Sequence, residues 1–217
     1  MKGDKLVITE EHVKVAQCIV DIILVQIMGS QKRFIITIAG ESGSGKSEIA
    51  ASLSEVLSRN AIKSIILQQD DYFVYPPKTN AEMRKRDINH VGLSEVRLAL
   101  LDSNLKNIIE GKDLLDKPLV IFDDDLITQE EVNLEGIKVA IVEGTYTTSL
   151  KNVHQRIFID RTYIDTMEAR KLRNREEQDD FLERILEIEH GIISLHKPRA
   201  DIIVTNNYEV IRVSNNG

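Results

Sequence analysis

The stretch Gly40-Glu41-Ser42-Gly43-Ser44-Gly45-Lys46-Ser47 matches the pattern G-x-x-x-x-G-K-[ST]. It follows Phe34-Ile35-Ile36-Thr37-Ile38-Ala39, a nearly unbroken apolar run that is typical of a strand covered on both faces of a parallel sheet. Residues 46–59 continue with apolar side chains at helical spacing. A strand, a glycine-rich loop and a helix in this order predict a phosphate-binding loop.

The residue types of this loop explain how it would bind phosphate. Glycines let the backbone wrap closely, so that N–H groups point inward at phosphate oxygens. The helix that begins at the end of the loop adds unpaired N–H groups and the positive end of its dipole. Lys46 would reach the β- and γ-phosphates, and the Ser47 hydroxyl would coordinate Mg²⁺. We therefore expect residues 40–47 to bind a nucleoside triphosphate.

Strand and helix patterns alternate on both sides of the loop. Further strands are predicted at residues 64–67, 119–122, 139–142, 156–159 and 201–204. One helix is expected between Ser94 as its cap and Gly111 as its stop, and residues 162–196 form a long, heavily charged helical segment. This alternation predicts an α/β fold, a three-layer arrangement of a parallel sheet with helices on both faces. We treat residues 1–217 as a single domain.

Composition limits the classes of protein. The chain has 217 residues, with 28 Lys+Arg against 35 Asp+Glu and a net charge of −7, which argues against a general nucleic-acid binder. Its one cysteine, Cys18, cannot form an internal disulfide and is expected to be buried. The apolar run 18–28 is interrupted by Asp21 and Gln26, so we expect no membrane span. Residues 1–10 lack the charged-then-apolar pattern of a signal peptide, and we expect a cytoplasmic location.

An N-terminal helix within residues 1–30 is predicted from Thr9 as its N-cap and Gly29 as its stop. Its apolar residues recur at helical spacing and form one stripe. The stripe would pack on the protein's own core, which we favour, or on a second subunit of a homo-oligomer. The residues of the stripe are Val13, Ala16, Val20, Leu24 and Ile27.

Two carboxylates follow predicted strands. Glu143 ends the run Val139-Ala140-Ile141-Val142, and Asp70 follows the strand at residues 64–67. The carboxyl ends of parallel strands form the edge where ligands bind, so both side chains should face the phosphate-binding loop. Glu143 would bind Mg²⁺ directly or through water. Asp70, or its neighbour Asp71, would orient an acceptor hydroxyl and take its proton, and we favour Asp70.

These motifs together resemble the uridine kinase and phosphoribulokinase group of P-loop kinases. In that group the loop is followed by a strand ending in Q-D-S-F-Y, an apolar strand ending in E-G, and a lid helix carrying R-x-x-R-D. The matching stretches here are Gln69-Asp70-Asp71-Tyr72-Phe73, Val142-Glu143-Gly144 and Arg170-Lys171-Leu172-Arg173-Asn174. Their order and spacing hold from about Phe34 to Val204.

The resemblance implies the roles of the site residues. Asp70 would be the catalytic base, and Ser47 and Glu143, together with Asp70, would hold Mg²⁺. Residues 162–196 would form a helical lid with its following helix. Arg170 and Arg173, three residues apart, would lie on one helix face and clamp the phosphates of ATP.

The sequence departs from this group where the acceptor binds. Asn89 stands where uridine kinases carry the aspartate that holds the ribose, and residues 121–128 lack the His and Arg that read the pyrimidine. We therefore expect an acceptor other than a pyrimidine nucleoside. The cationic cluster Arg84, Lys85 and Arg86 would suit an anionic acceptor, whereas the aspartates at residues 123–125 would suit a polyol or a cation. Both alternatives stay open.

Two aromatic residues lie beside the expected base. Tyr72 and Phe73 would either line the acceptor pocket or pack beneath it. The favoured function is an ATP- and Mg²⁺-dependent phosphotransferase that acts on a hydroxyl group of a small molecule. The alternatives are a nucleotide-hydrolysing switch and a nucleotide-sensing protein.

Overall fold

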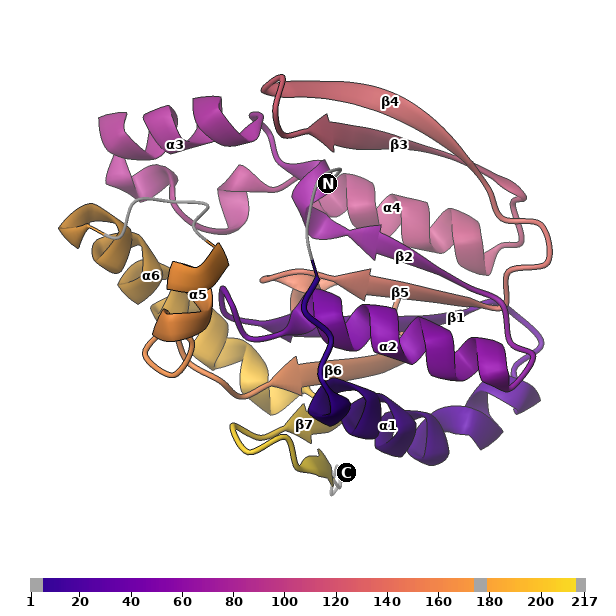
Figure 1. Ribbon diagram of the computed structural model, residues 1–217. Coiled ribbons are helices and arrows are strands. Elements are labelled where there is room, and N and C mark those ends of the chain that lie inside the picture. The colour runs from indigo at the N-terminus through magenta and orange to yellow at the C-terminus, as the bar shows by residue number, and fades with distance from the viewer. Residues whose placement is uncertain (1–5, 174–178, 214–217) are drawn as a thin grey trace.

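A computed structural model describes residues 6–173 and 179–213 and shows a twisted, mostly parallel sheet between two helical layers (Figure 1). The strand order is β2-β5-β1-β6-β7-β8, parallel from β2 to β7, with β8 antiparallel to β7. The strands of this sheet are β1 (Phe34–Gly40), β2 (Ser64–Gln68), β5 (Val139–Glu143), β6 (Gln155–Ile159), β7 (Ile202–Val204) and β8 (Val210–Arg212). The predicted fold class is confirmed.

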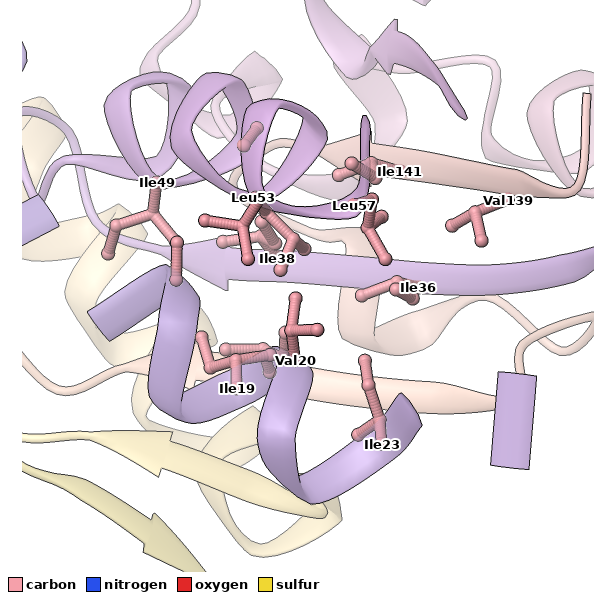
Figure 2. Packing of buried hydrophobic residues seen from close by; sticks show 14 of the residues in the cluster. Ile19, Val20, Ile23, Ile36, Ile38, Ile49, Leu53, Leu57, Val139 and Ile141 are labelled. Carbon is pink, nitrogen blue, oxygen red and sulfur yellow. The ribbon is translucent and has the colours of Figure 1, made fainter. Parts of the chain in front are cut away.

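One face of the sheet is covered by α1 (Glu10–Gly29) and α2 (Lys46–Arg59), which lie side by side (Figure 1). Figure 2 shows Ile49 and Leu53 of α2 directed at Ile38 of β1, with Ile19 of α1 beside them. Every residue of β1 is buried, because helices cover the strand on both sides. This packing holds the loop between β1 and α2 in place.

The opposite face is covered by α4 (Leu98–Ile109) and the C-terminal end of α6 (Asp180–Ile193). The apolar stripe of α4 consists of Leu101, Leu105 and Ile108, all fully buried. The stripe and the stop at Gly111 agree with the predicted helix. Ser94 does not cap it, because Ser94 lies in a separate 3₁₀ turn and Arg97 occupies the N-cap position.

A β-hairpin stands apart from the main sheet (Figure 1). Its strands β3 (Leu114–Ile121) and β4 (Leu126–Asn133) pair antiparallel with each other in a separate two-stranded sheet. The prediction that residues 119–122 add a strand to the parallel sheet is therefore wrong. The helix α3 (Pro77–Arg86) was also not predicted, because it has no apolar stripe and only Asn80 in it is buried.

The charged segment 162–196 is not one continuous helix. It contains α5 (Met167–Arg173) and α6, and α6 is followed by a 3₁₀ helix over Ser194–Arg199. Other 3₁₀ turns lie at Gln69–Tyr72, Ile88–His90, Leu93–Glu95 and Thr147–Ser149.

The N-terminal helix begins after Thr9, as predicted, and packs on α2 and the sheet. Cys18 is exposed, which contradicts the expected buried position. The buried side runs through Val15, Ile19 and Ile23, and Cys18 lies outside this stripe. By length and composition alone, α1 is long and apolar enough to cross a membrane. The interrupted apolar run at residues 18–28 predicts no such span.

Candidate active site

The loop of residues 40–47 connects β1 to α2 at the carboxyl end of the parallel strands. Lys46 Nζ donates a hydrogen bond to the carbonyl oxygen of Glu41 at 2.9 Å, so the lysine lies across the loop. Gly43 has a φ of +76°, and a Cβ there would lie 2.9 Å from Cγ of Arg170. Glycine is therefore required at this position for both the backbone turn and the close approach of α5.

Glu143 lies beside the loop because β5 is the neighbour of β1 in the sheet. Its Oε1 accepts hydrogen bonds from the Ser47 hydroxyl and from Nε2 of Gln68, both at 3.2 Å. The next residue, Gly144, allows the ends of β5 and β2 to approach, since a Cβ there would lie only 2.2 Å from Cβ of Gln69. The strand end thus places a carboxylate against the loop serine.

Glu143 is buried and Asp70 is half-buried, and the two carboxylates lie close enough for the charge of Asp70 to affect Glu143. Burial raises the pKa of Asp70, and the nearby Lys46 opposes this rise. Burial also raises the pKa of Glu143, and the charge of Asp70 raises it further. Two carboxylates that disfavour each other's charge beside a hydroxyl and an ammonium group form an oxygen-rich site in which a hard divalent cation fits.

The two residues that follow Asp70, Asp71 and Tyr72, are buried and make hydrogen bonds within the fold. Asp71 is buried and accepts hydrogen bonds from Lys117 Nζ at 2.8 Å and from the Val120 N–H at 3.1 Å, so it anchors the hairpin. Tyr72 is fully buried, and its hydroxyl accepts a hydrogen bond from Asn104 at 2.9 Å. Burial raises the pKa of Tyr72 to about 12. Tyr72 therefore packs in the core, and its prediction as a substrate-binding residue is wrong.

The lid segment contacts the loop directly. The Thr166 hydroxyl donates to the Ser42 carbonyl at 2.9 Å, and the Tyr163 N–H donates to Glu41 Oε2 at 2.5 Å. Arg170 borders the cavity beside Ser42 and Gly43, and its Nη1 donates to the Tyr163 carbonyl at 2.5 Å. The side chain of Arg173, the other predicted lid arginine, lies outside the described residues.

The second residue of the loop has a role that the sequence pattern did not show. The buried carboxylate of Glu41 contacts Nδ1 of His190 on α6 at 2.6 Å through Oε1. Its Oε2 accepts from the lid segment at Tyr163, so one side chain connects the loop, the lid and α6. The pattern leaves this position open to any residue, and hence carried no signal for it.

A cavity of about 320 Å³ joins these elements. Lys46, Ser47, Asp70 and Glu143 line one end, where the loop lies. The other lining side chains come mainly from α3, α6 and the hairpin turn, and they include Phe73, Pro77, Lys78, Asn80, Ala81, Arg84, Phe122, Thr145, Leu182, Ile185, Leu186 and Glu189. We call this second group the acceptor end.

Of the two predicted substrate residues on α3, only Arg84 lies at the acceptor end of the cavity. Arg84 lines the cavity, but its guanidinium is held by Glu95, with Nε to Oε1 at 2.5 Å, and by Glu189, with Nη2 to Oε1 at 3.1 Å. Arg86 is exposed and is not among the residues that line the cavity, and Lys85 pairs with Glu82 at 3.1 Å. The prediction of Arg86 as a substrate residue is therefore wrong.

The aspartates of the hairpin turn also have a structural contact. The Asp125 carboxylate accepts hydrogen bonds from the Lys78 N–H at 2.6 Å and the Thr79 hydroxyl at 2.7 Å, and so caps the start of α3. This contact positions α3 and its Arg84 above the cavity. Neither Asp125 nor Asn89 lines the cavity.

A parallel sheet of this order with a G-x-x-x-x-G-K-S loop between β1 and α2 defines a P-loop nucleotide-binding fold of the kinase type. Residues 35–189 match the Phosphoribulokinase / Uridine kinase family, and the chain belongs to that family. The predicted family is thereby confirmed.

Two curated relatives are small-molecule kinases. The chain is 29% identical over 189 residues to the bifunctional alpha-galactosidase/sucrose kinase AgaSK of Mediterraneibacter gnavus, covering 81% of this chain but only 20% of that longer protein. It is 28% identical over 150 residues to a uridine kinase of Lactobacillus helveticus, covering 69% of each chain. These relatives place the chain among small-molecule kinases, as its sequence predicted.

Solved structures share the fold. A D-glycerate 3-kinase from Cryptococcus neoformans superposes with a TM-score of 0.59 at 12% identity, covering 91% of this chain and 99% of the other. At this identity the likeness supports the architecture described above.

Proposed function

We propose that this protein transfers the γ-phosphoryl group of ATP to a hydroxyl group of a small metabolite. One observation carries the proposal: the loop residues Lys46 and Ser47 line the same cavity as Asp70 and Glu143. A cavity that combines a phosphate-binding loop with a buried carboxylate and a separate acceptor end brings together the groups that a phosphotransfer reaction needs.

The loop would bind the phosphates of ATP. Backbone N–H groups of residues 40–47 and the N-terminus of α2 supply hydrogen-bond donors and partial positive charge. Lys46 would exchange its contact with the Glu41 carbonyl, 2.9 Å away, for the β- and γ-phosphates. The lid arginines Arg170 and Arg173 would add positive charge over the transferred group.

Ser47, Glu143 and Asp70 would hold Mg²⁺. The Ser47 hydroxyl lies 3.2 Å from a Glu143 oxygen, and the charges of Glu143 and Asp70 oppose each other in the absence of a cation. These are the oxygen donors that Mg²⁺ prefers. When bound, the ion would neutralise negative charge on the phosphates during transfer.

Asp70 would act as the general base. Its carboxylate lines the cavity that also contains the acceptor end, where it can accept a proton from the attacking hydroxyl. Burial raises the pKa of Asp70, which makes the ionised carboxylate a better proton acceptor. Asp71 is the weaker candidate because its carboxylate is bound to Lys117 and the hairpin backbone.

The acceptor end favours a kinase over a nucleotide-hydrolysing switch or a sensor. Side chains from α3 and α6 enclose space next to Asp70 that hydrolysis alone would not need. The acceptor is proposed to be something other than a pyrimidine nucleoside, because residues 121–128 lack the His and Arg that read the pyrimidine in uridine kinases. The proposal includes a cytoplasmic location, where ATP and small metabolites are available.

A coupled assay of ADP release tests the function. With ATP and Mg²⁺ present, addition of the right acceptor should raise the rate well above the background with water, and Lys46→Ala should abolish that increase. A slow rate that no acceptor changes would contradict the proposal and favour a switch or a sensor.

A further inference from the structure

The charges around Arg84 distinguish between the two kinds of acceptor that the sequence left open. We infer that the acceptor end binds an uncharged polyhydroxylated molecule of the carbohydrate type rather than an anionic sugar phosphate or acid. This inference rests on the proposed function and specifies its second substrate.

The only arginine on α3 that reaches the cavity, within the described residues, already has two carboxylate partners. Glu95 binds its guanidinium through both oxygens, at 2.5 Å to Nε and 3.1 Å to Nη2. Glu189 of α6 binds Nη2 at 3.1 Å. The side chain of Glu95 is 0% exposed, and those of Arg84 and Glu189 are each 12% exposed, so the three groups form a largely desolvated cluster.

The cluster is locked in position by further hydrogen bonds. Glu95 also accepts from Nδ2 of Asn80 at 2.8 Å and from the Gly92 N–H at 2.7 Å. The Asn80 Oδ1 in turn contacts Nε2 of His90 at 3.0 Å. Moving Glu95 away from Arg84 would break several of these contacts, so the charge of the guanidinium is already paired within the protein and does not require an incoming anion.

The charge balance at this end is negative. Glu95 and Glu189 place two carboxylates on the guanidinium of Arg84, and the other arginine that lines the cavity in the part of the chain that the structure describes, Arg170, lies at the loop end. Lys78 also lines the cavity, but it is exposed, and its Nζ donates to the Asp123 carbonyl at 2.8 Å. A phosphate or carboxylate on the acceptor would therefore meet like charge in a poorly solvated site, which is unfavourable.

Hydroxyl groups match the same surface. Carboxylates accept hydrogen bonds from hydroxyls, so Glu189 suits a hydroxyl group of the acceptor. Phe73, Phe122 and Leu186 line the same cavity and supply apolar area for the C–H faces of a ring. Polar groups and apolar side chains in one cavity are the combination that a sugar requires.

The first experiment compares acceptors in matched pairs. The wild-type protein with ATP and Mg²⁺ is assayed for ADP release with fructose and fructose 6-phosphate, glucose and gluconate, and glycerol and glycerate, and with uridine. We expect at least one uncharged sugar or polyol to stimulate release at least about tenfold more than its anionic partner. Preference for the anionic partners, or for uridine over every sugar, would overturn the inference while leaving the proposed kinase activity intact.

The proposed function fails separately. If ATP binding is detected by thermal shift but no acceptor stimulates ADP release, both the proposed function and the inference that rests on it are lost.

The second experiment removes one charge of the cluster. Glu189→Gln should raise KM for the preferred sugar by about 10- to 100-fold, because a buried hydrogen-bonding partner of the acceptor is changed. The discrimination against its anionic partner should fall at the same time. The thermal shift with an ATP analogue should stay as in the wild type, which verifies that the variant is folded.

The matched control is Glu187→Gln, which makes the same chemical change on the exposed side of α6. It should leave both KM and the discrimination unchanged. Equal effects of the two substitutions, or an unchanged KM for Glu189→Gln, would contradict the assignment of Glu189 to the acceptor.

Discussion

Replacement of Asp70 by asparagine tests the catalytic base and the electrostatics of the site together. A positioned general base contributes roughly 10²- to 10⁴-fold to the rate, so Asp70→Asn should lower kcat by about that factor. This loss corresponds to about 3 to 5 kcal/mol in the activation barrier. The affinity for ATP should change much less, because the loop of residues 40–47 remains intact.

The same substitution should stabilise the protein without ligands. Burial raises the pKa of Asp70 above that of the unfolded chain, so the ionised carboxylate disfavours folding at neutral pH. The stability of the wild-type protein with Asp70 protonated is fully present below the unfolded pKa, and it is lost as the pH rises through the higher folded pKa. Each unit of pKa difference is worth about 1.4 kcal/mol. Asparagine carries no charge and should remove this loss, and it should also relieve the repulsion that raises the pKa of Glu143.

The neighbouring Asp71→Asn is the matched control, with the opposite expected result. Asp71 and Lys117 are buried with side-chain exposures of 4% and 6%, and their charged groups are 2.8 Å apart. Breaking a buried ion pair costs roughly 3 to 5 kcal/mol. Because Glu130 still contacts Lys117 at 3.1 Å, we expect a smaller loss, about 2 to 3 kcal/mol.

Urea unfolding at pH 7.5 and pH 5 and steady-state assays with the preferred acceptor measure both variants. The expected pattern is a stable but slow Asp70→Asn variant and an unstable Asp71→Asn variant with nearly normal kcat when folded. Normal turnover of Asp70→Asn would refute its role as the base. Destabilisation of that variant at pH 7.5 would refute the electrostatic argument.

Three further predictions concern other parts of the structure. Lys46→Ala should weaken ATP binding at least about tenfold by calorimetry, since a charge-assisted contact to phosphate is lost, and an unchanged Kd would contradict the assignment of the loop. Gly144→Ala should lower the free energy of unfolding by about 1 to 3 kcal/mol, because the added Cβ would lie 2.2 Å from Cβ of Gln69, and equal stability to the wild type would show that the strand ends can separate. Burial lowers the pKa of His154, whose Nδ1 accepts a hydrogen bond from the Ile35 N–H, so stability should be present above its unfolded pKa and fall as pH drops through the lower folded value. His154→Asn, which can accept the same hydrogen bond, should flatten this pH dependence in urea titrations between pH 7.5 and 5.5.

Elements with strong apolar patterns could be predicted from the sequence. The helix from Lys46 to Arg59 has the predicted bounds, and the strand before the loop differs only by including Gly40. These elements pack directly against the core. Their buried positions are therefore apolar, and they form a continuous run in the strand and recur at helical spacing in the helix. Glu143 and Asp70 could be placed for a similar reason, since Glu143 ends a fully buried strand and Asp70 comes soon after a partly buried one.

Segments without such a pattern could not be predicted. The helix α3 buries only Asn80 and is held by Asp125 from the hairpin turn rather than by an apolar stripe. The strand β4 alternates half-buried and exposed residues, and the aspartates before it were interpreted as a ligand cluster instead of as a turn. Tyr72 is an aromatic residue close to the proposed base in sequence, which makes it a candidate for the acceptor pocket. In the structure it lies in a 3₁₀ turn and its side chain is buried in the core.

The two ends of the cavity differ in how the sequence encodes them. The phosphate end uses residues that are close in sequence or that follow adjacent strands, so a local motif and the sheet order are enough to assemble it. The acceptor end depends on Arg84, Glu95 and Glu189, and Arg84 and Glu189 are separated by 105 residues. Nothing in the local pattern of either segment shows that these charges meet. Because the guanidinium is already paired by contacts within the chain, a cationic cluster in the sequence does not by itself predict an anionic substrate. The charge that an acceptor meets follows from the tertiary partners of Arg84, and changing Glu189 should therefore alter acceptor choice without altering the phosphate end.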